Sequence, residues 1–164
     1  MKSFNKPLIL LLTVFSTNAL AQKLNLLIGT YTKPGKSEGI YVYEFDTQTG
    51  KSIYKNKAVG LNNPSYLAIS KDQKFVYAVS EAGPGKGGAS AFTFDKTSGA
   101  LSLLNTKPSI GNGPCYVAVG ATNKHVFLAN YGGGSLTVLP VKPDGSLEDT
   151  EQHIVYQGSS VNKD

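Results

Sequence analysis

The chain has 164 residues, and its 16 basic and 11 acidic side chains give a formal net charge of +5. Since 40% of the residues are hydrophobic and 16% are charged, the composition excludes both a disordered chain and a bundle of membrane helices. Every basic residue is Lys, so no guanidinium is present to hold a carboxylate or phosphate through two parallel hydrogen bonds. The single Cys excludes an intramolecular disulfide framework and a zinc ribbon.

Residues 1–21 have the order of a secretory signal peptide. Two Lys lie near the start, an apolar stretch follows at 8–15, and Ala19-Leu20-Ala21 places small residues at a cleavage site. The apolar stretch is shorter than the about 20 residues that cross a bilayer as a helix. We expect cleavage after Ala21 and a periplasmic or secreted protein with no membrane partner. The remaining Lys residues are spread along the chain, which argues against a nucleic-acid partner.

After the signal peptide, the chain repeats itself at a spacing of 50 residues. Segment 63–69 recurs as 113–119, and segment 75–81 recurs as 126–131. Each recurring run is short and bounded by Gly, Pro, Asn or Asp, which is typical of strands joined by turns. No helical periodicity is sustained in this part of the chain. The pattern therefore predicts four antiparallel strands in each repeat.

Four-stranded units at this period predict an all-β fold, the β-propeller, in which each unit is one blade around a central channel. The first unit lacks the innermost strand, the second is complete, and the third ends in a strand-like segment at 153–156. These units make about three blades, whereas propellers close with typically four to eight. We expect residues 22–164 to be the front part of a longer propeller, with an exposed last blade that promotes self-association.

The repeats resemble the seven-bladed propeller lactonase family, which includes 6-phosphogluconolactonases and fungal carboxy-muconate lactonising enzymes. The segments that carry the resemblance are 28–32, 39–43, 63–68, 113–115 and 129–135. The resemblance implies a ring of seven blades of which this chain is the N-terminal portion. It also implies a hydrolase of carbohydrate metabolism that opens a sugar lactone, such as 6-phosphogluconolactone, to the acid. The family's catalytic His, Glu and Arg lie beyond the matched positions, so we expect this chain alone to be inactive.

A set of polar and aromatic residues at strand ends would line one mouth of the channel. These channel candidates are Tyr31, Ser65, Tyr66, Glu81, Cys115, Tyr116, Asn130 and Tyr131. The first alternative is structural, because turn-forming Asn and packed Tyr need no ligand. For Cys115, a small buried hydrophobe is the favoured interpretation, since free Cys is among the most buried residue types.

Three other features carry little functional signal. The segment 83–88 has the spacing G-x-G-x-x-G, but a predicted strand follows it instead of the helix that a dinucleotide site requires. Neither His125 nor His153 has a nucleophile or carboxylate at a recognisable spacing, so neither is expected to be a catalytic base. No cluster of His, Asp or Glu has metal-ligand spacing, and we expect no metal and no cofactor.

Two functions compete with a lactonase: a non-catalytic periplasmic or surface propeller scaffold, and a muconate-type cycloisomerase. The signal peptide argues against a phosphorylated intermediate of the cytoplasm and favours another lactone as the small-molecule partner. A His-containing segment followed by Glu and Arg residues downstream of position 164 would favour the enzyme.

Overall fold

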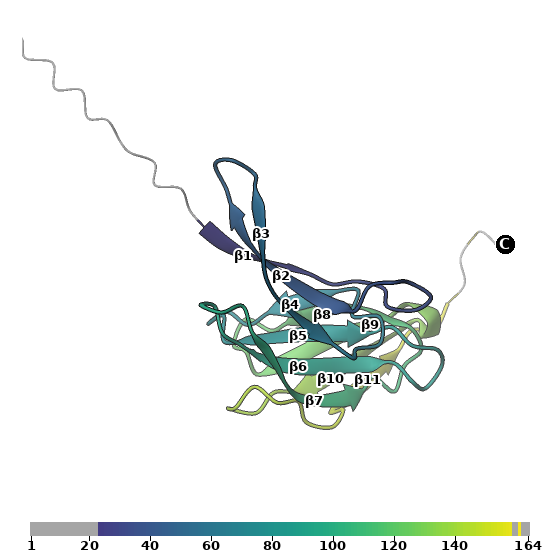
Figure 1. Cartoon of the computed structure of the whole chain (residues 1–164). Coiled ribbons are helices and arrows are strands. Elements are labelled where there is room, and N and C mark those ends of the chain that lie inside the picture. Colours follow the sequence, from purple (N-terminus) through teal and green to yellow (C-terminus); the bar gives the residue numbers. More distant parts are fainter. Residues whose placement is uncertain (1–22, 159–160, 162–164) are drawn as a thin grey trace, which may run out of the picture.

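The computed structural model describes residues 23–158 and 161, which form three antiparallel β-sheets (Figure 1). Blade 1 comprises β1 (Lys23–Ile28), β2 (Gly39–Asp46) and β3 (Ser52–Val59). Blade 2 comprises β4 (Leu67–Ile69), β5 (Phe75–Ser80), β6 (Gly88–Phe94) and β7 (Leu101–Pro108). Blade 3 comprises β8 (Pro114–Val119), β9 (His125–Asn130), β10 (Ser135–Pro140) and β11 (Gln152–Val155), with the 3-10 turn η1 (Tyr131–Gly133) between β9 and β10. The predicted all-β class is confirmed.

The predicted signal peptide and its cleavage site lie outside the described residues. Within them, no helix is long and apolar enough to cross a membrane. Blade 1 has three strands, with β1 at its edge, as predicted from the missing first member of the repeat. Blade 3 has four, because β11 pairs with β10 from Ser135↔Val155 to Val138↔Gln152. Strand β11 corresponds to the strand-like segment predicted at 153–156.

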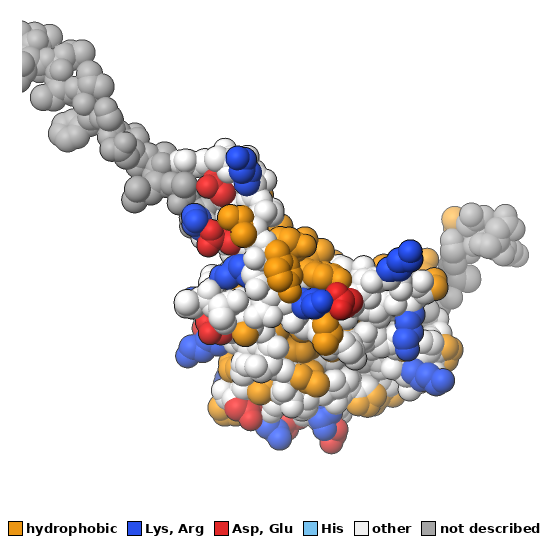
Figure 2. All heavy atoms as spheres, viewed as in Figure 1, with side chains coloured by type: hydrophobic (Ala, Val, Ile, Leu, Met, Phe, Trp, Pro, Cys, Tyr) orange, Lys and Arg blue, Asp and Glu red, His pale blue; other side chains and the backbone are white. Residues whose placement is uncertain are grey.

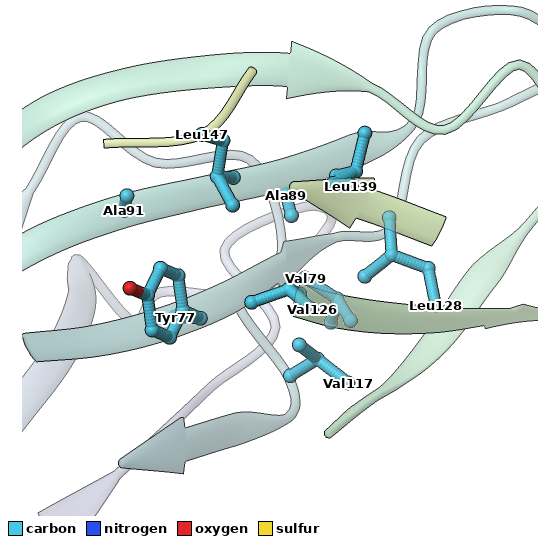
Figure 3. Packing of buried hydrophobic residues seen from close by; sticks show 9 residues of the cluster. All are labelled: Tyr77, Val79, Ala89, Ala91, Val117, Val126, Leu128, Leu139 and Leu147. Carbon is cyan, nitrogen blue, oxygen red and sulfur yellow. The ribbon is translucent and has the colours of Figure 1, made fainter. Parts of the chain in front are cut away.

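Blade 2 is buried on both faces because it lies between blade 1 and blade 3. Side chains alternate in direction along each strand, so successive residues lie on opposite faces. One face carries Val76, Ala78, Phe92 and Phe94, which share a core cluster with Ile40 and Val42 of blade 1. The opposite face carries Tyr77, Val79, Ala89 and Ala91, which meet Val117, Val126, Leu128 and Leu139 of blade 3 (Figure 3). Neighbouring residues of β5 thus pack against different blades.

The free face of blade 1 is apolar. Leu24, Leu26 and Ile28 of β1 are 44%, 38% and 40% exposed, whereas the intervening Leu27 packs on the core shared with blade 2. Figure 2 shows hydrophobic side chains gathered on the visible surface over the base of the β2–β3 hairpin, bordered by Lys and acidic side chains. Burial of such a patch against another surface is favourable by roughly 25 cal/mol for each Å² removed from water.

One turn repeats in all three blades at the same end. Asp46, Asp95 and Asp144 each accept hydrogen bonds from backbone N–H groups two or three residues later, the first of them 2.9, 2.8 and 3.0 Å long. These bonds, together with Ser hydroxyl donors to Asp95 and Asp144, lower the pKa of all three carboxyls. Each Asp therefore closes its hairpin as an ionised acceptor.

The core also contains one buried phenol. Tyr77 is 1% exposed, and its hydroxyl donates a hydrogen bond of 3.1 Å to the Gly145 carbonyl in the loop that follows β10. Burial raises the pKa of Tyr77 to about 12, because the low dielectric of the interior disfavours the phenolate. Blades 2 and 3 are thus joined by a hydrogen bond as well as by apolar packing.

Candidate functional site

The channel candidates converge on the end of the blades opposite the Asp turns. Tyr31 follows β1, Glu81 follows β5, and Ser65 precedes β4. Because β4 and β5 run antiparallel, the start of one lies beside the end of the other. The same relation between β8 and β9 brings Cys115 and Tyr116 to this end of blade 3.

A carboxylate lies at the centre of this region. Glu81 Oε1 accepts a hydrogen bond from Ser65 Oγ, and Glu81 Oε2 accepts one of 2.9 Å from Tyr31 Oη. The hydrogen bond to Glu81, and then the partial burial of the phenol, raise the pKa of Tyr31. At neutral pH Tyr31 is therefore a protonated donor, and the carboxylate joins blade 1 to blade 2 with both oxygens in fixed positions.

Asn63, which is not among the channel candidates, holds the loops that carry these groups. Its Oδ1 accepts hydrogen bonds of 2.8 Å from the backbone N–H groups of Thr32 and Lys33. Its Nδ2 donates one of 3.1 Å to the backbone carbonyl of Glu81. Asn63 has a positive φ of 44°, and the equivalent position in blade 3 is Gly113, with φ 63°. The pairing of Asn with Gly at one repeat position is the signal that could have revealed this turn.

Tyr66 and Tyr116 form an aromatic pair at the same end of blades 2 and 3 as the carboxylate cluster. They occupy equivalent positions in blades 2 and 3, with ring centroids 4.6 Å apart and planes inclined by 45°. Their side chains remain 43% and 46% exposed. Because Tyr66 directly follows Ser65, the aromatic pair and the carboxylate cluster share one short segment of chain. Small-molecule pockets combine aromatic lining with a few fixed polar groups, and both kinds of group occur at this end of blades 2 and 3.

Cys115 occupies in blade 3 the position that Ser65 occupies in blade 2. Its thiol is half-buried and weakly hydrogen-bonded, with Sγ 3.9 Å from the Ala129 carbonyl oxygen. Cys115 therefore belongs to the same end of the channel but does not hold Glu81.

Asn130 and Tyr131 do not join the Glu81 cluster in the described structure. Asn130 is 1% exposed and donates hydrogen bonds to Ser135 Oγ at 3.1 Å and Thr137 Oγ1 at 3.0 Å, inside blade 3. A Cβ on Gly111 would lie 2.3 Å from the Asn130 side chain, so only Gly leaves room for it. Tyr131 begins η1 and is 88% exposed. The Asn130 side chain is thus buried and hydrogen-bonded within blade 3, whereas Tyr131 lies in solvent.

His125 has a partner that its sequence spacing did not reveal. Its Nε2 lies 3.2 Å from Glu151 Oε2, at the far end of β9 from the Glu81 cluster. Among residues 23–158 and 161, no three His, Cys, Asp or Glu side chains are arranged to hold a metal ion. The loop at 83–88 leads into strand β6, as predicted, and not into a helix.

A protein-family model described as "Lactonase, 7-bladed beta-propeller" matches residues 25–164. The chain belongs to this lactonase family. The predicted incomplete propeller is thereby confirmed, with the three sheets as its blades. Family membership explains why the loops after β1 and β5 meet beside the inner strand β4, since propeller blades surround a common axis.

Members of the family resemble this chain in sequence and structure. A Bacillus subtilis 6-phosphogluconolactonase is 40% identical over 131 residues, which are 80% of this chain and 37% of the relative. The periplasmic gluconolactonase of Pseudomonas aeruginosa is 37% identical with a TM-score of 0.79, over 87% of this chain and 41% of that structure. A Bacteroides fragilis crystal structure is 44% identical with a TM-score of 0.81, over 86% and 38%. The chain therefore spans about two fifths of the length of these relatives.

Proposed function

We propose that this chain supplies three blades of an exported lactonase that hydrolyses a sugar lactone to its open acid. Membership of the lactonase family supports the reaction class. The observation that carries the assignment to this region is the Glu81 carboxylate, fixed by hydroxyl groups from two blades at the end where the channel loops meet. In this proposal, Tyr31, Ser65 and Glu81 hold the substrate.

Lactone hydrolysis requires a base that activates water and donors that stabilise the developing oxyanion. The protonated Tyr31 is a donor, and Glu81 offers acceptor positions, but Glu81 already receives two hydrogen bonds. The chain contains no Arg, which removes the bidentate anion clamp. We therefore assign binding to the three blades and expect catalysis only when further blades complete the ring.

A pH-stat assay of lactone opening tests this proposal. Purified chain should show no saturable hydrolysis of gluconolactone or of its 6-phosphate, whereas a form extended through the downstream reading frame should show it. In the active extended form, Glu81→Gln should raise KM more than it lowers kcat, because Glu81 holds the substrate in this proposal. Saturation kinetics from the 164-residue chain, abolished by a substitution within it, would refute the division of roles.

We also propose export through the signal peptide at 1–21. The resemblance to a periplasmic gluconolactonase supports this location. N-terminal sequencing of the exported protein should begin at Gln22. A different mature start, or full retention in the cytoplasm, would contradict it.

Self-association through the exposed last blade, as expected from the sequence, remains a proposal for the three-blade chain, and we extend it to the free face of blade 1. The free face of β1 exposes Leu24, Leu26 and Ile28 in one row, and propeller blades are stabilised by burying such faces against their neighbours. Association would cover this surface in the absence of another blade.

A further inference from the structure

We propose that Glu81 and the Tyr66–Tyr116 pair form a subsite for the neutral, polyhydroxylated part of the substrate, and that Glu81 excludes a phosphate group from it. This inference rests on the proposed lactonase function and specifies which lactones the site takes: those without a phosphate. Its evidence comes from the hydrogen bonds of Glu81, the absence of a cationic partner, and the exposed aromatic rings.

The carboxylate has acceptor capacity left for a substrate. Each of its oxygens receives one hydroxyl hydrogen bond, from Ser65 or from Tyr31. A carboxylate accepts about four hydrogen bonds in total, so each oxygen can accept another from a sugar hydroxyl. The position of Glu81 is set before the ligand arrives, since its backbone carbonyl is bonded to Asn63 Nδ2 as well. A fixed acceptor reduces the ordering cost of binding.

No ion pair within residues 23–158 neutralises Glu81. The salt bridges of this part of the chain join Lys23 to Glu44, Lys57 to Glu38, Lys107 to Asp149 and His125 to Glu151. Glu81 is held by uncharged hydroxyls, so its negative charge acts on whatever enters the site. A sugar hydroxyl gains a hydrogen bond there, whereas a phosphate meets a like charge.

The aromatic pair supplies the complementary apolar contact. A sugar ring carries hydroxyl groups around its rim and C–H groups on its faces. The rings of Tyr66 and Tyr116 are partly exposed. The face of an aromatic ring is partly negative, so it attracts the weakly positive hydrogens of C–H groups. Tyr66 directly follows Ser65, which donates a hydrogen bond to Glu81, so the aromatic pair and the carboxylate lie at the same end of blade 2.

The direct test is equilibrium binding to the full 164-residue chain. The probes are 1,5-anhydroglucitol, a neutral pyranose without a lactone bond, and its 6-phosphate, each titrated by isothermal calorimetry and by NMR of the Tyr rings. The neutral probe should bind about tenfold more tightly, because like charges close together at a protein surface repel by a factor of that order. Glu81→Gln should reduce this preference to about twofold or less.

Two further variants separate the roles. Tyr66→Ala should weaken binding of both probes by a similar factor, about fivefold, and leave their ratio unchanged. Glu151→Gln, which removes a carboxylate at the opposite end of blade 3, should change neither affinity nor ratio. Ser65→Ala keeps the charge of Glu81 and should keep the preference for the neutral probe. Circular dichroism and thermal melts verify that each variant is folded.

The inference is overturned if the phosphorylated probe binds as tightly as the neutral one, if neither binds to the folded chain, or if Glu81→Gln leaves the ratio unchanged. None of these measurements depends on lactone hydrolysis. An extended form without lactonase activity would refute the proposed function while the binding preference stands. Hydrolysis combined with equal binding of both probes would refute the subsite alone.

Discussion

The Tyr31 hydroxyl donates a hydrogen bond of 2.9 Å to Glu81 Oε2 across 50 residues of sequence. The two residues occupy equivalent positions in successive blades, each just after the second strand of its unit. A substitution of Glu81 therefore alters the environment of Tyr31 in the neighbouring blade. Titration of the Tyr31 phenol can measure this effect.

We predict that Glu81→Gln lowers the pKa of Tyr31. The hydrogen bond to Glu81 is the largest cause of the raised value, and the charge of Glu81 adds to it. Without the charge, the phenol should titrate closer to the about 10 of free Tyr. The measurement is an ultraviolet titration of Tyr ionisation, with Tyr31→Phe used to assign the signal. An unchanged Tyr31 titration would contradict the contact.

Tyr77→Phe should make the chain less sensitive to alkali. The folded-state pKa of about 12 lies above the unfolded value, so this stability contribution is present below pH 10 and is lost as pH rises toward 12. Between pH 7 and pH 11 the loss is about 1.4 kcal/mol in the native chain. The variant loses one hydrogen bond at neutral pH, about 1 kcal/mol. Urea denaturation of the native chain and the variant at pH 7 and pH 11 measures the free energy of unfolding under both conditions. An equal loss of stability between pH 7 and pH 11 in the two proteins would contradict the role of Tyr77.

Asn130→Ala should destabilise blade 3, whereas Tyr131→Ala should have little effect. Removal of the Asn130 amide leaves the buried Ser135 and Thr137 hydroxyls without a donor, a loss of about 1–3 kcal/mol. The exposed Tyr131 should change the free energy of unfolding by about 0.5 kcal/mol or less. Chemical denaturation of both variants makes the comparison. Gly111→Ala should resemble Asn130→Ala, because its Cβ displaces that side chain.

Asp95→Asn should flatten the acid dependence of stability. The hydrogen bonds from Ser98 and Thr97 lower the pKa of Asp95 in the folded chain. This contribution is therefore present above the unfolded value of about 3.9 and is lost as pH falls through the folded value. Asn accepts the same backbone hydrogen bonds without titrating. Thermal melts from pH 7 to pH 2 should show a shallower decline for the variant, and Glu148→Gln serves as the control.

Two consecutive substitutions in β1 test self-association. Leu26→Asp places a charge on the free face and should shift the chain toward monomer in light scattering at several concentrations. Leu27→Asp places the charge in the core shared with blade 2 and should lower the melting temperature instead. A native chain that is monomeric at every concentration would exclude association through this face.

The strands were predictable because each repeat combines alternating apolar residues with Gly, Pro or Asp at its turns. The repeat also placed Tyr31, Ser65 and Glu81 at one end, and the structure brings them into contact. The buried position of Asn130 was not predictable, because a shift of one residue at a strand end reverses the direction of the side chain. It depends, in addition, on the space left by Gly111, 19 positions earlier in the chain.

The alternation of side chains in blade 2 has an evolutionary consequence. Val76 and Tyr77 are adjacent in sequence, but the first belongs to the core shared with blade 1 and the second to the core shared with blade 3. Compensation for a changed volume at Val76 must therefore come from residues such as Ile40 or Val42, and for Tyr77 from residues such as Val126 or Leu128. Epistasis in this protein should couple positions tens of residues apart and leave immediate neighbours nearly independent.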